Sequence, residues 1–269
     1  MQKESAWDDL PLGRVSALVD VYTPSLLRRI ARADARINLG WSGALPFTGH
    51  DSWTAYELTW LNPKGRPECA VLSLEIPSAS PCFVESKSLK LYLNSFRQTV
   101  FANWLAVEET VSTDLTHMCA SRVTVSLMLP RTFQTRTLHA AQHLEGQSLD
   151  ACDIKVSRYN VEPDLLAIEG ANDVRESLVS DLFSTLCPVT GQPDYATVII
   201  EYEGPAISHA ALLRYLISYR QDACFHEQAV ERIFLDIYSR CSPKTLSVLG
   251  RFFRRGGIDI HPLRSSPSR

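Results

Sequence analysis

The sequence predicts an α+β protein in which one unit of antiparallel sheet with a helix pair occurs twice. Three observations lead to this fold class. Several short segments alternate apolar and polar residues, as half-buried strands do. Other segments place apolar residues at steps of three and four, the period of a helix. The order of these segments repeats after about 130 residues, although the two halves share little residue identity.

The first half predicts two strands, two helices and a further strand, in that order. Asn62-Pro63-Lys64-Gly65 separates the first two alternating segments and is typical of a turn, so these strands form a hairpin. The strands are expected at 56–60, 72–76 and 123–129, and the helices over 89–100 and 104–118.

The second half repeats this order after a polar connection over 131–150. Ser208 is a suitable N-cap for its first helix, and Gly256-Gly257 is expected to turn the chain between its last two strands. The strands are expected at 154–159, 198–202, 246–252 and 258–260, and the helices over 208–219 and 225–237.

The chain divides accordingly into three parts. Residues 1–50 form a leader with an Arg cluster (Arg28, Arg29, Arg32 and Arg36) and no clean periodicity, and we expect it to pack on the body as an N-terminal extension. The first module is expected over 51–135 and the second over 136–269. A chain of 269 residues is long enough for two such modules.

Composition excludes several classes of protein. The 27 basic and 30 acidic residues give a net charge of −3, which excludes a strongly basic nucleic-acid binder. Hydrophobic residues make up 45% of the chain, enough for a buried core. The longest apolar runs are far shorter than the ~20 residues that cross a bilayer. The start of the chain is polar and lacks an apolar signal core. We expect a soluble, cytoplasmic protein.

The seven cysteines favour a reducing compartment. Their number is odd and no two form a Cys-x-x-Cys pair, so neither a disulfide framework nor a cysteine zinc site is expected. The sequence also lacks the glycine-rich fingerprint of dinucleotide-binding folds and the phosphate-binding loop. His139 and His143, with Glu145, have the spacing of metal ligands on a helix, but a solvated histidine pair is the favoured interpretation. No metal is expected.

The segment from Cys187 to Asp194 is the strongest candidate for chemistry. Pro188, Gly191 and Pro193 make it a rigid, non-helical turn that presents one thiol. Such a turn can bring the Asp194 carboxyl back toward the thiol, which pairs a nucleophile with a proton donor. The alternative is a structural turn with a buried cysteine.

Three further segments favour a ligand-binding site. Lys87 and Lys90 stand at the start of the first helix, where an anionic ligand offsets their charge. Glu227, beside His226, is able to accept paired hydrogen bonds from a guanine-like base. The turn Arg254-Arg255-Gly256-Gly257 combines basic side chains with backbone that allows close approach of a phosphate. Each of these is also compatible with an ordinary solvated surface.

Taken together, these residues resemble the family of NADPH-dependent 7-cyano-7-deazaguanine reductases, the nitrile reductases of queuosine biosynthesis, a tRNA modification, in its long form. The run from Glu85 to Tyr92 matches the family's signature at every position, and the turn from Cys187 to Asp194 is similarly close. The two matches lie in separate halves, in the family's order. The resemblance extends from residue 56 onward and includes the stretch 39–51.

The resemblance implies a tandem tunnelling fold, with each module ordered strand-strand-helix-helix-strand-strand. The sequence pattern shows no last strand for the first module. It also implies a homodimer that acts on a small-molecule substrate, without metal or flavin, and binds neither nucleic acid nor membrane.

The resemblance further implies how the site works. Cys187 would attack the nitrile carbon to form a thioimide, Asp194 would be the general acid, and two NADPH would reduce the adduct to 7-aminomethyl-7-deazaguanine. The implied substrate-binding residues are Val84, Glu85, Ser86, His226 and Glu227, and the implied NADPH-binding residues are Ser86, Lys87, Arg255 and Gly256.

Three alternatives remain at this point. A related cyclohydrolase would need zinc ligands near its active helices, and none is visible. A cysteine hydrolase acting on a nitrile or amide would leave the basic turn and the Lys pair unexplained. A non-catalytic purine-binding scaffold would not need both Cys187 and Asp194.

Overall fold

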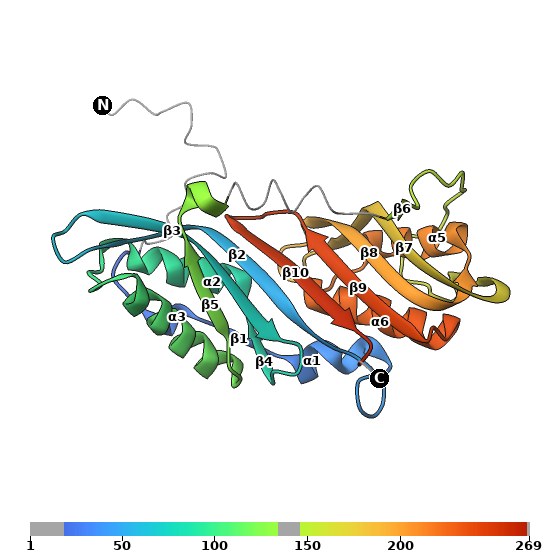
Figure 1. Ribbon diagram of the computed structural model, residues 1–269, viewed down its shortest axis with the longest axis horizontal. Helices are drawn as coiled ribbons and strands as arrows, with labels where there is room; N and C mark the ends of the chain where they lie inside the picture. Colours follow the sequence, from blue (N-terminus) through green and yellow to red (C-terminus); the bar gives the residue numbers. More distant parts are fainter. Residues whose placement is uncertain (1–18, 134–145, 268–269) are drawn as a thin grey trace, which may run out of the picture.

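A computed structural model describes residues 19–133 and 146–267 of the chain. Its main feature is one eight-stranded sheet in the order β5-β3-β2-β10-β9-β8-β7-β6, with the long helices packed against a single face (Figure 1). The mixed α+β class is confirmed. The strands are β1 (Arg29–Ala31), β2 (Thr48–Leu61), β3 (Pro67–Pro77), β4 (Cys82–Val84), β5 (Thr124–Met128), β6 (Gln147–Ser148), β7 (Ile168–Leu186), β8 (Pro193–Ile207), β9 (Thr245–Phe252) and β10 (Ile258–Ser265).

Within residues 19–133 and 146–267, four long helices cover the sheet, two in each half. They are α2 (Ser86–Asn94), α3 (Trp104–Cys119), α5 (His209–Ser218) and α6 (His226–Cys241), and a short helix α1 (Arg32–Arg36) precedes them. The expected helix over 89–100 ends earlier, because α2 passes into a 3-10 turn over Ser95–Gln98 and Val100 lies beyond it. Ser208 is the N-cap of α5, although its side chain bonds to Glu169 and not to the helix.

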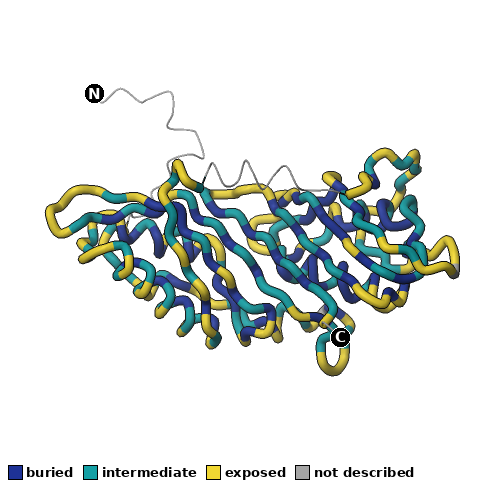
Figure 2. Tube along the Cα trace, in the orientation of Figure 1, coloured by how far each residue is buried: buried dark blue, intermediate teal, exposed yellow. Residues whose placement is uncertain are grey.

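The two halves share the sheet through the pairing of β10 with β2. Ile260 lies opposite Trp53 in an antiparallel ladder, while the other edge of β10 pairs with β9. Two buried cores lie under the sheet, one built mainly from the first half and one mainly from the second. Ile258 and Ile260 of β10 belong to the first core, so the chain's last strand completes the core of its opposite half. Figure 2 shows the buried stretches running along both parts of the sheet.

The strand expected at 154–159 is wrong. Ile154 packs against the second core, but this segment forms no strand ladder. The first long strand of the second half is instead β7, which the sequence pattern does not reveal. Its pairing with β8 shifts register twice, between Ile168 and Asp173 and again between Ser180 and Phe183. Each bulge moves the buried side chains off the two-residue period, so the alternation that marks a strand is lost.

The described part of the leader packs on both halves, with Leu27 in the first core and Leu39 and Phe47 in the second. β1 forms an antiparallel ladder with β4, in which Arg29 lies opposite Val84. The backbone N–H of Glu85 donates to the carbonyl of Arg28, and the Ser88 hydroxyl accepts from the Arg28 N–H. The leader therefore supports the start of α2. Among the described residues, no helix is long and apolar enough to span a bilayer.

Gly49, near the start of β2, permits a close approach of the β10 backbone in the sheet that joins the halves. Its φ is +144°, and a Cβ built there would lie 2.0 Å from the carbonyl oxygen of Leu263 on β10. We expect Gly49→Ala to lower the free energy of unfolding by about 2–5 kcal/mol, from backbone strain and displacement of β10. Chemical denaturation measures this loss.

Gly65→Ala is the matched control. Gly65 also has positive φ, at +73°, but an added Cβ would meet nothing within 4 Å. Its cost should be about 1–2 kcal/mol, from the left-handed backbone alone. Equal losses for the two variants would contradict the close packing of β10 on β2.

Candidate active site

A cavity of about 240 Å³ lies between the two cores and is lined by residues from both halves. All ten residues to which the family resemblance gives a role line it: Val84, Glu85, Ser86, Lys87, Cys187, Asp194, His226, Glu227, Arg255 and Gly256. The structure therefore brings them together, although they come from β4, α2, the turn after β7, β8, α6 and the β9–β10 turn.

The inner wall of the cavity is apolar and aromatic. Trp53 of β2 and Ile258 and Ile260 of β10 contribute from adjacent strands. Phe83 and Phe225 meet edge to face, with ring centroids 5.7 Å apart. Such surfaces suit a flat heteroaromatic ligand, because they exclude water and leave recognition to a few polar groups.

Cys187 stands on a tight turn at one side of the cavity. Its backbone N–H donates to the carbonyl of Gln192, and its own carbonyl accepts from the N–H of Gly191, which has a φ of +67°. Burial raises the pKa of the thiol, but hydrogen bonds from Thr190 and the Val189 N–H, with the charge of Arg255, outweigh it and lower the pKa below its usual value. The site therefore favours the thiolate, the nucleophilic form.

Asp194 is mostly buried and lies between two basic side chains. Its Oδ1 accepts a hydrogen bond of 2.6 Å from Arg255, and its Oδ2 lies 3.4 Å from Nε2 of His226. Burial raises the pKa of this carboxyl, whereas His226 and Arg255 lower it, and the net direction is downward. With Arg255 and His226 in these positions, Asp194 is a carboxylate.

Arg255 lies closer to the catalytic candidates than the sequence indicates. Besides Asp194 it donates to the Thr190 hydroxyl at 3.0 Å and to the Gln192 side-chain oxygen at 2.8 Å. The guanidinium thus ties the β9–β10 turn to the turn that carries Cys187. Its expected contact with NADPH is not tested by this arrangement and stays a prediction.

Glu85 has a structural task that the sequence reading did not assign. It is the N-cap of α2, and its two carboxylate oxygens accept the backbone N–H groups of Lys87 and Ser88 at 2.8 and 2.7 Å. These bonds orient the carboxylate beside the cavity and satisfy the first turn of the helix. Each oxygen keeps a lone pair for a ligand, so the expected substrate contact stays a prediction.

His226 and Glu227 begin α6 at the inner end of the cavity. The His226 ring stacks on Phe252, with centroids 3.9 Å apart. Glu227 is fully enclosed, and its Oε1 has no hydrogen-bond partner among the described residues. Burial, followed by the charge of Asp51, raises the pKa of Glu227 to about 8. An unpaired buried carboxyl in a cavity is a strong sign of a missing ligand donor.

Basic groups gather on the α2 side of the cavity. Lys87 is exposed there, and Lys90 reaches toward the β9–β10 turn, so that a Cβ built on Gly256 would lie 3.5 Å from its Nζ. Together with Arg255 and the start of α2, these groups fit an anionic ligand such as a phosphate.

The alternative metal site lies outside the described residues, because 139, 143 and 145 fall in the gap at 134–145. In the two described stretches, no cluster of three His, Cys, Asp or Glu has the arrangement of metal ligands.

Comparison with known families matches two parts of the chain. Residues 18–127 match the model for the N-terminal part of "Nitrile reductase, 7-cyano-7-deazaguanine-reductase", and residues 193–269 match a "QueF-like protein" model. Cys187 lies between the two matched spans.

Curated relatives match nearly the whole chain. Two are named "NADPH-dependent 7-cyano-7-deazaguanine reductase": one from Burkholderia lata is 49% identical over 95% of this chain and 93% of its own length, and one from Bordetella avium is 47% identical over 96% and 93%. The chain belongs to the family of NADPH-dependent 7-cyano-7-deazaguanine reductases. The family resemblance read from the Glu85–Tyr92 and Cys187–Asp194 segments, and with it the class of oxidoreductase, is confirmed.

A solved structure titled "Crystal structure of the archaeosine synthase QueF-Like in the apo form" also matches. It is 18% identical, covers 36% of this chain and 95% of its own, and has a TM-score of 0.32. The assignment to the reductase family rests on the curated relatives and the family models.

Sequence reasoning missed several residues that shape this site. Thr190, which donates to the Cys187 sulfur, was seen only as part of the turn. Trp53 and Ile260 were read as strand residues, and their place in the cavity follows from the β2–β10 pairing. The alternation of both segments indicated a buried face, but nothing local indicated that the first and last long strands are neighbours.

Replacement of Thr190 tests whether its hydrogen bond favours the thiolate form of Cys187. Thr190→Val removes a hydroxyl hydrogen bond to the Cys187 sulfur and nearly keeps the shape, so the pKa of the thiol should rise. A bond to a charged group contributes about 1.5–3 kcal/mol, so alkylation of Cys187 by iodoacetamide at neutral pH should slow by about tenfold or more. Peptide mapping measures the rate at each cysteine. An unchanged rate at Cys187 would contradict the role of Thr190.

Proposed function

We propose that this chain reduces the nitrile of 7-cyano-7-deazaguanine to the primary amine, with NADPH as the reductant and a covalent thioimide on Cys187. The observation that carries the proposal is the placement of Cys187, Asp194 and Glu227 around one cavity in a chain of this family. In this assignment the reaction serves queuosine biosynthesis and consumes two NADPH per substrate.

The first step is attack of the Cys187 thiolate on the nitrile carbon. A C–S bond forms, one π bond of the nitrile breaks, and the nitrogen takes a proton, which gives a neutral thioimide. A nitrile is a poor hydride acceptor, whereas a protonated thioimide is a better one, so the covalent step prepares the carbon for reduction. The lowered pKa of the Cys187 thiol supports this role.

Asp194 is the proposed acid for the nitrile nitrogen, and the structure adds a condition. Its carboxylate is held ionised by Arg255 at 2.6 Å and His226 at 3.4 Å. We infer that Arg255 must release Asp194 before the carboxyl carries a proton. Because the adduct is expected to form without NADPH, binding of the substrate has to loosen this ion pair.

Two hydride transfers complete the reaction. When bound, NADPH supplies hydride to the thioimide carbon. The carbon–sulfur bond then breaks, Cys187 leaves as the thiolate, and an imine remains in the cavity, where the second hydride and a proton give the amine. The apolar wall around Trp53, Phe225 and Ile260 protects this imine from hydrolysis by excluding water.

The remaining lining residues hold the two ligands. Glu227 accepts the N–H groups of the deazaguanine, with His226, Val84, Glu85 and Ser86 around the ring. Ser86, Lys87, Arg255 and Gly256 hold NADPH, since the basic groups on the α2 side fit its phosphates.

We further propose that the chain is a tandem of tunnelling-fold modules and acts as a homodimer, with the parts 1–50, 51–135 and 136–269. The second half supports this order most fully, since β7, β8, α5, α6, β9 and β10 follow one another along the chain. The outer edge of β5 pairs with no strand among the described residues, and an open edge is a place where a second copy adds.

The nucleophile is tested by mass. The protein mixed with 7-cyano-7-deazaguanine, without NADPH, should gain the full mass of the substrate under denaturing conditions, and Cys187→Ala should abolish both the adduct and the reduction. Cys224→Ala is the matched control, because Cys224 lines the same cavity but burial raises the pKa of its thiol well above the usual value. Loss of the adduct in Cys224→Ala alone would overturn the assignment.

The role of Asp194 as the acid is tested by the rate at which the same adduct forms without NADPH. Asp194→Asn keeps the shape but has no carboxyl proton, so adduct formation should slow by about 10²–10⁴-fold. Stopped-flow absorbance of the adduct measures the rate. An unchanged rate would remove Asp194 from the acid role.

Lys87 and Arg255 should respond differently to replacement by Ala. Both changes should raise the apparent constant for NADPH about ten- to a hundredfold, because each removes a charge-assisted phosphate contact. Only Arg255→Ala should also alter the pH profile of adduct formation, since Arg255 pairs with Asp194 and Lys87 does not. Steady-state kinetics and the adduct rate without NADPH distinguish them. Identical pH profiles would contradict the tie between Arg255 and the acid.

A further inference from the structure

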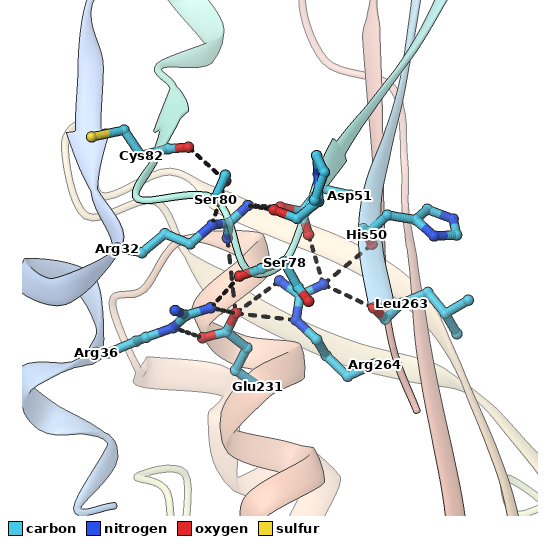
Figure 3. A network of polar contacts seen from close by, with 11 residues as sticks. Arg32, Arg36, His50, Asp51, Ser78, Ser80, Cys82, Glu231, Leu263 and Arg264 are labelled. Carbon is cyan, nitrogen blue, oxygen red and sulfur yellow. Dashed lines mark hydrogen bonds and ion pairs between the residues drawn. The ribbon is translucent and has the colours of Figure 1, made fainter. Parts of the chain in front are cut away.

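A buried network of charged side chains lies one helical turn from Glu227. Glu231, four residues further along α6, accepts hydrogen bonds from Arg36 at 2.7 Å and from Arg264 at 2.8 Å. Arg264 also forms an ion pair of 2.8 Å with Asp51, which is paired in turn with Arg32 at 2.5 Å. Figure 3 shows these side chains converging from separate parts of the chain.

The network joins the leader to α6, the helix that carries Glu227. Arg32 and Arg36 belong to α1, Asp51 to β2, Glu231 to α6 and Arg264 to β10. All except Arg36 are almost fully buried. Further hydrogen bonds from Arg32 to Ser80 and from Arg36 to the carbonyl of Ser78 fix both guanidiniums. The leader thus enters the interior beside the helix that carries Glu227.

The charges of this network do not balance by themselves. Its members are three guanidiniums, on Arg32, Arg36 and Arg264, and two carboxylates, on Asp51 and Glu231. A surplus positive charge in a buried cluster is costly unless an anion neutralises it. Glu227 is the neighbouring group that provides this charge when it is ionised, since residues four apart lie on one face of a helix.

Both the positively and the negatively charged side chains of the network affect the pKa of Glu227. Burial and the Asp51 charge raise the pKa of its carboxyl to about 8, while Arg32, Arg264 and its own backbone N–H oppose them. His226 and Glu231 are the other ionisable neighbours on α6, and Arg36 faces the same cluster from α1. At neutral pH the protonated and ionised forms of Glu227 are therefore close in free energy, and a single charge decides between them.

We propose that the leader is part of the base-recognition site. In this proposal Arg32 is a positioning residue whose positive charge keeps Glu227 a hydrogen-bond acceptor, and the negative charge of Asp51 opposes this effect. This inference rests on the proposed function, in which Glu227 accepts the N–H groups of the deazaguanine. A protonated Glu227 presents a hydroxyl to those donors and loses one acceptor site. The charge of Arg32 thereby sets the pH range in which the base binds.

The test follows binding of 7-cyano-7-deazaguanine by calorimetry from pH 6 to 9. All proteins carry Cys187→Ala, so that no adduct forms. With the network intact, affinity should rise by up to tenfold per pH unit below about 8 and then level off, because binding requires the ionised carboxyl.

The variants are chosen to move the pH midpoint of this rise in affinity in opposite directions. Arg32→Gln removes a positive charge and should shift it upward by about one pH unit. Asp51→Asn removes a negative charge and should shift it downward. Arg32→Lys keeps the charge but not the fork of hydrogen bonds, so its midpoint should stay near that of the intact network. A structural role alone would weaken binding in all three variants without opposite shifts.

Asp236→Asn is the control for damage to α6. Asp236 is a partly buried carboxyl further along the same helix, bonded to Tyr215 and not among the residues lining the cavity. It should lower thermal stability without moving the midpoint. Midpoints of Arg32→Gln and Asp51→Asn that coincide with that of the intact network would overturn the inference. If Arg32→Gln does not fold, Asp51→Asn and Arg32→Lys decide it. Absence of binding by the intact network at every pH would instead contradict the proposed function.

Discussion

The burial of Arg264 is the constraint on which the arrangement of this protein depends. Its guanidinium is completely enclosed, and it is paired with Asp51 of β2 and Glu231 of α6. A buried charge is tolerated only when partners and hydrogen bonds replace its hydration. Arg264 therefore requires that β10, β2 and α6 meet at one point, where the last strand of the chain joins the first long strand of the sheet.

The candidate site lies at the same junction. β10 and β2 supply the apolar wall through Ile260 and Trp53, and α6 begins at His226 and Glu227. The turn that carries Cys187 is tied to the β9–β10 turn by Arg255. The proposed nucleophile, acid and base-recognition group thus come from separate parts of the chain and are brought together by one pairing of strands.

Much of this arrangement is predictable from the sequence, and the limits have physical causes. Alternation predicted β8, β9 and β10, and helical spacing predicted α3 and α6, because each pattern reflects one buried face. β7 was missed because its two bulges break the two-residue period. Cys187 and Glu227 were recognised from their local motifs. The partners of Asp51 and Glu231 were not, since ion pairs between residues on separate elements, from 19 to about 200 positions apart, leave no local pattern. The contact of Arg255 with Asp194 was missed for the same reason.

The central claim is that this junction carries out a four-electron reduction of a nitrile. The most direct measurement is the stoichiometry of the complete reaction, with NADPH oxidation followed by absorbance and the product quantified by chromatography. Two NADPH should be consumed for each 7-aminomethyl-7-deazaguanine formed. A ratio of one with an aldehyde as product, or turnover of the nitrile without NADPH oxidation, would contradict the account.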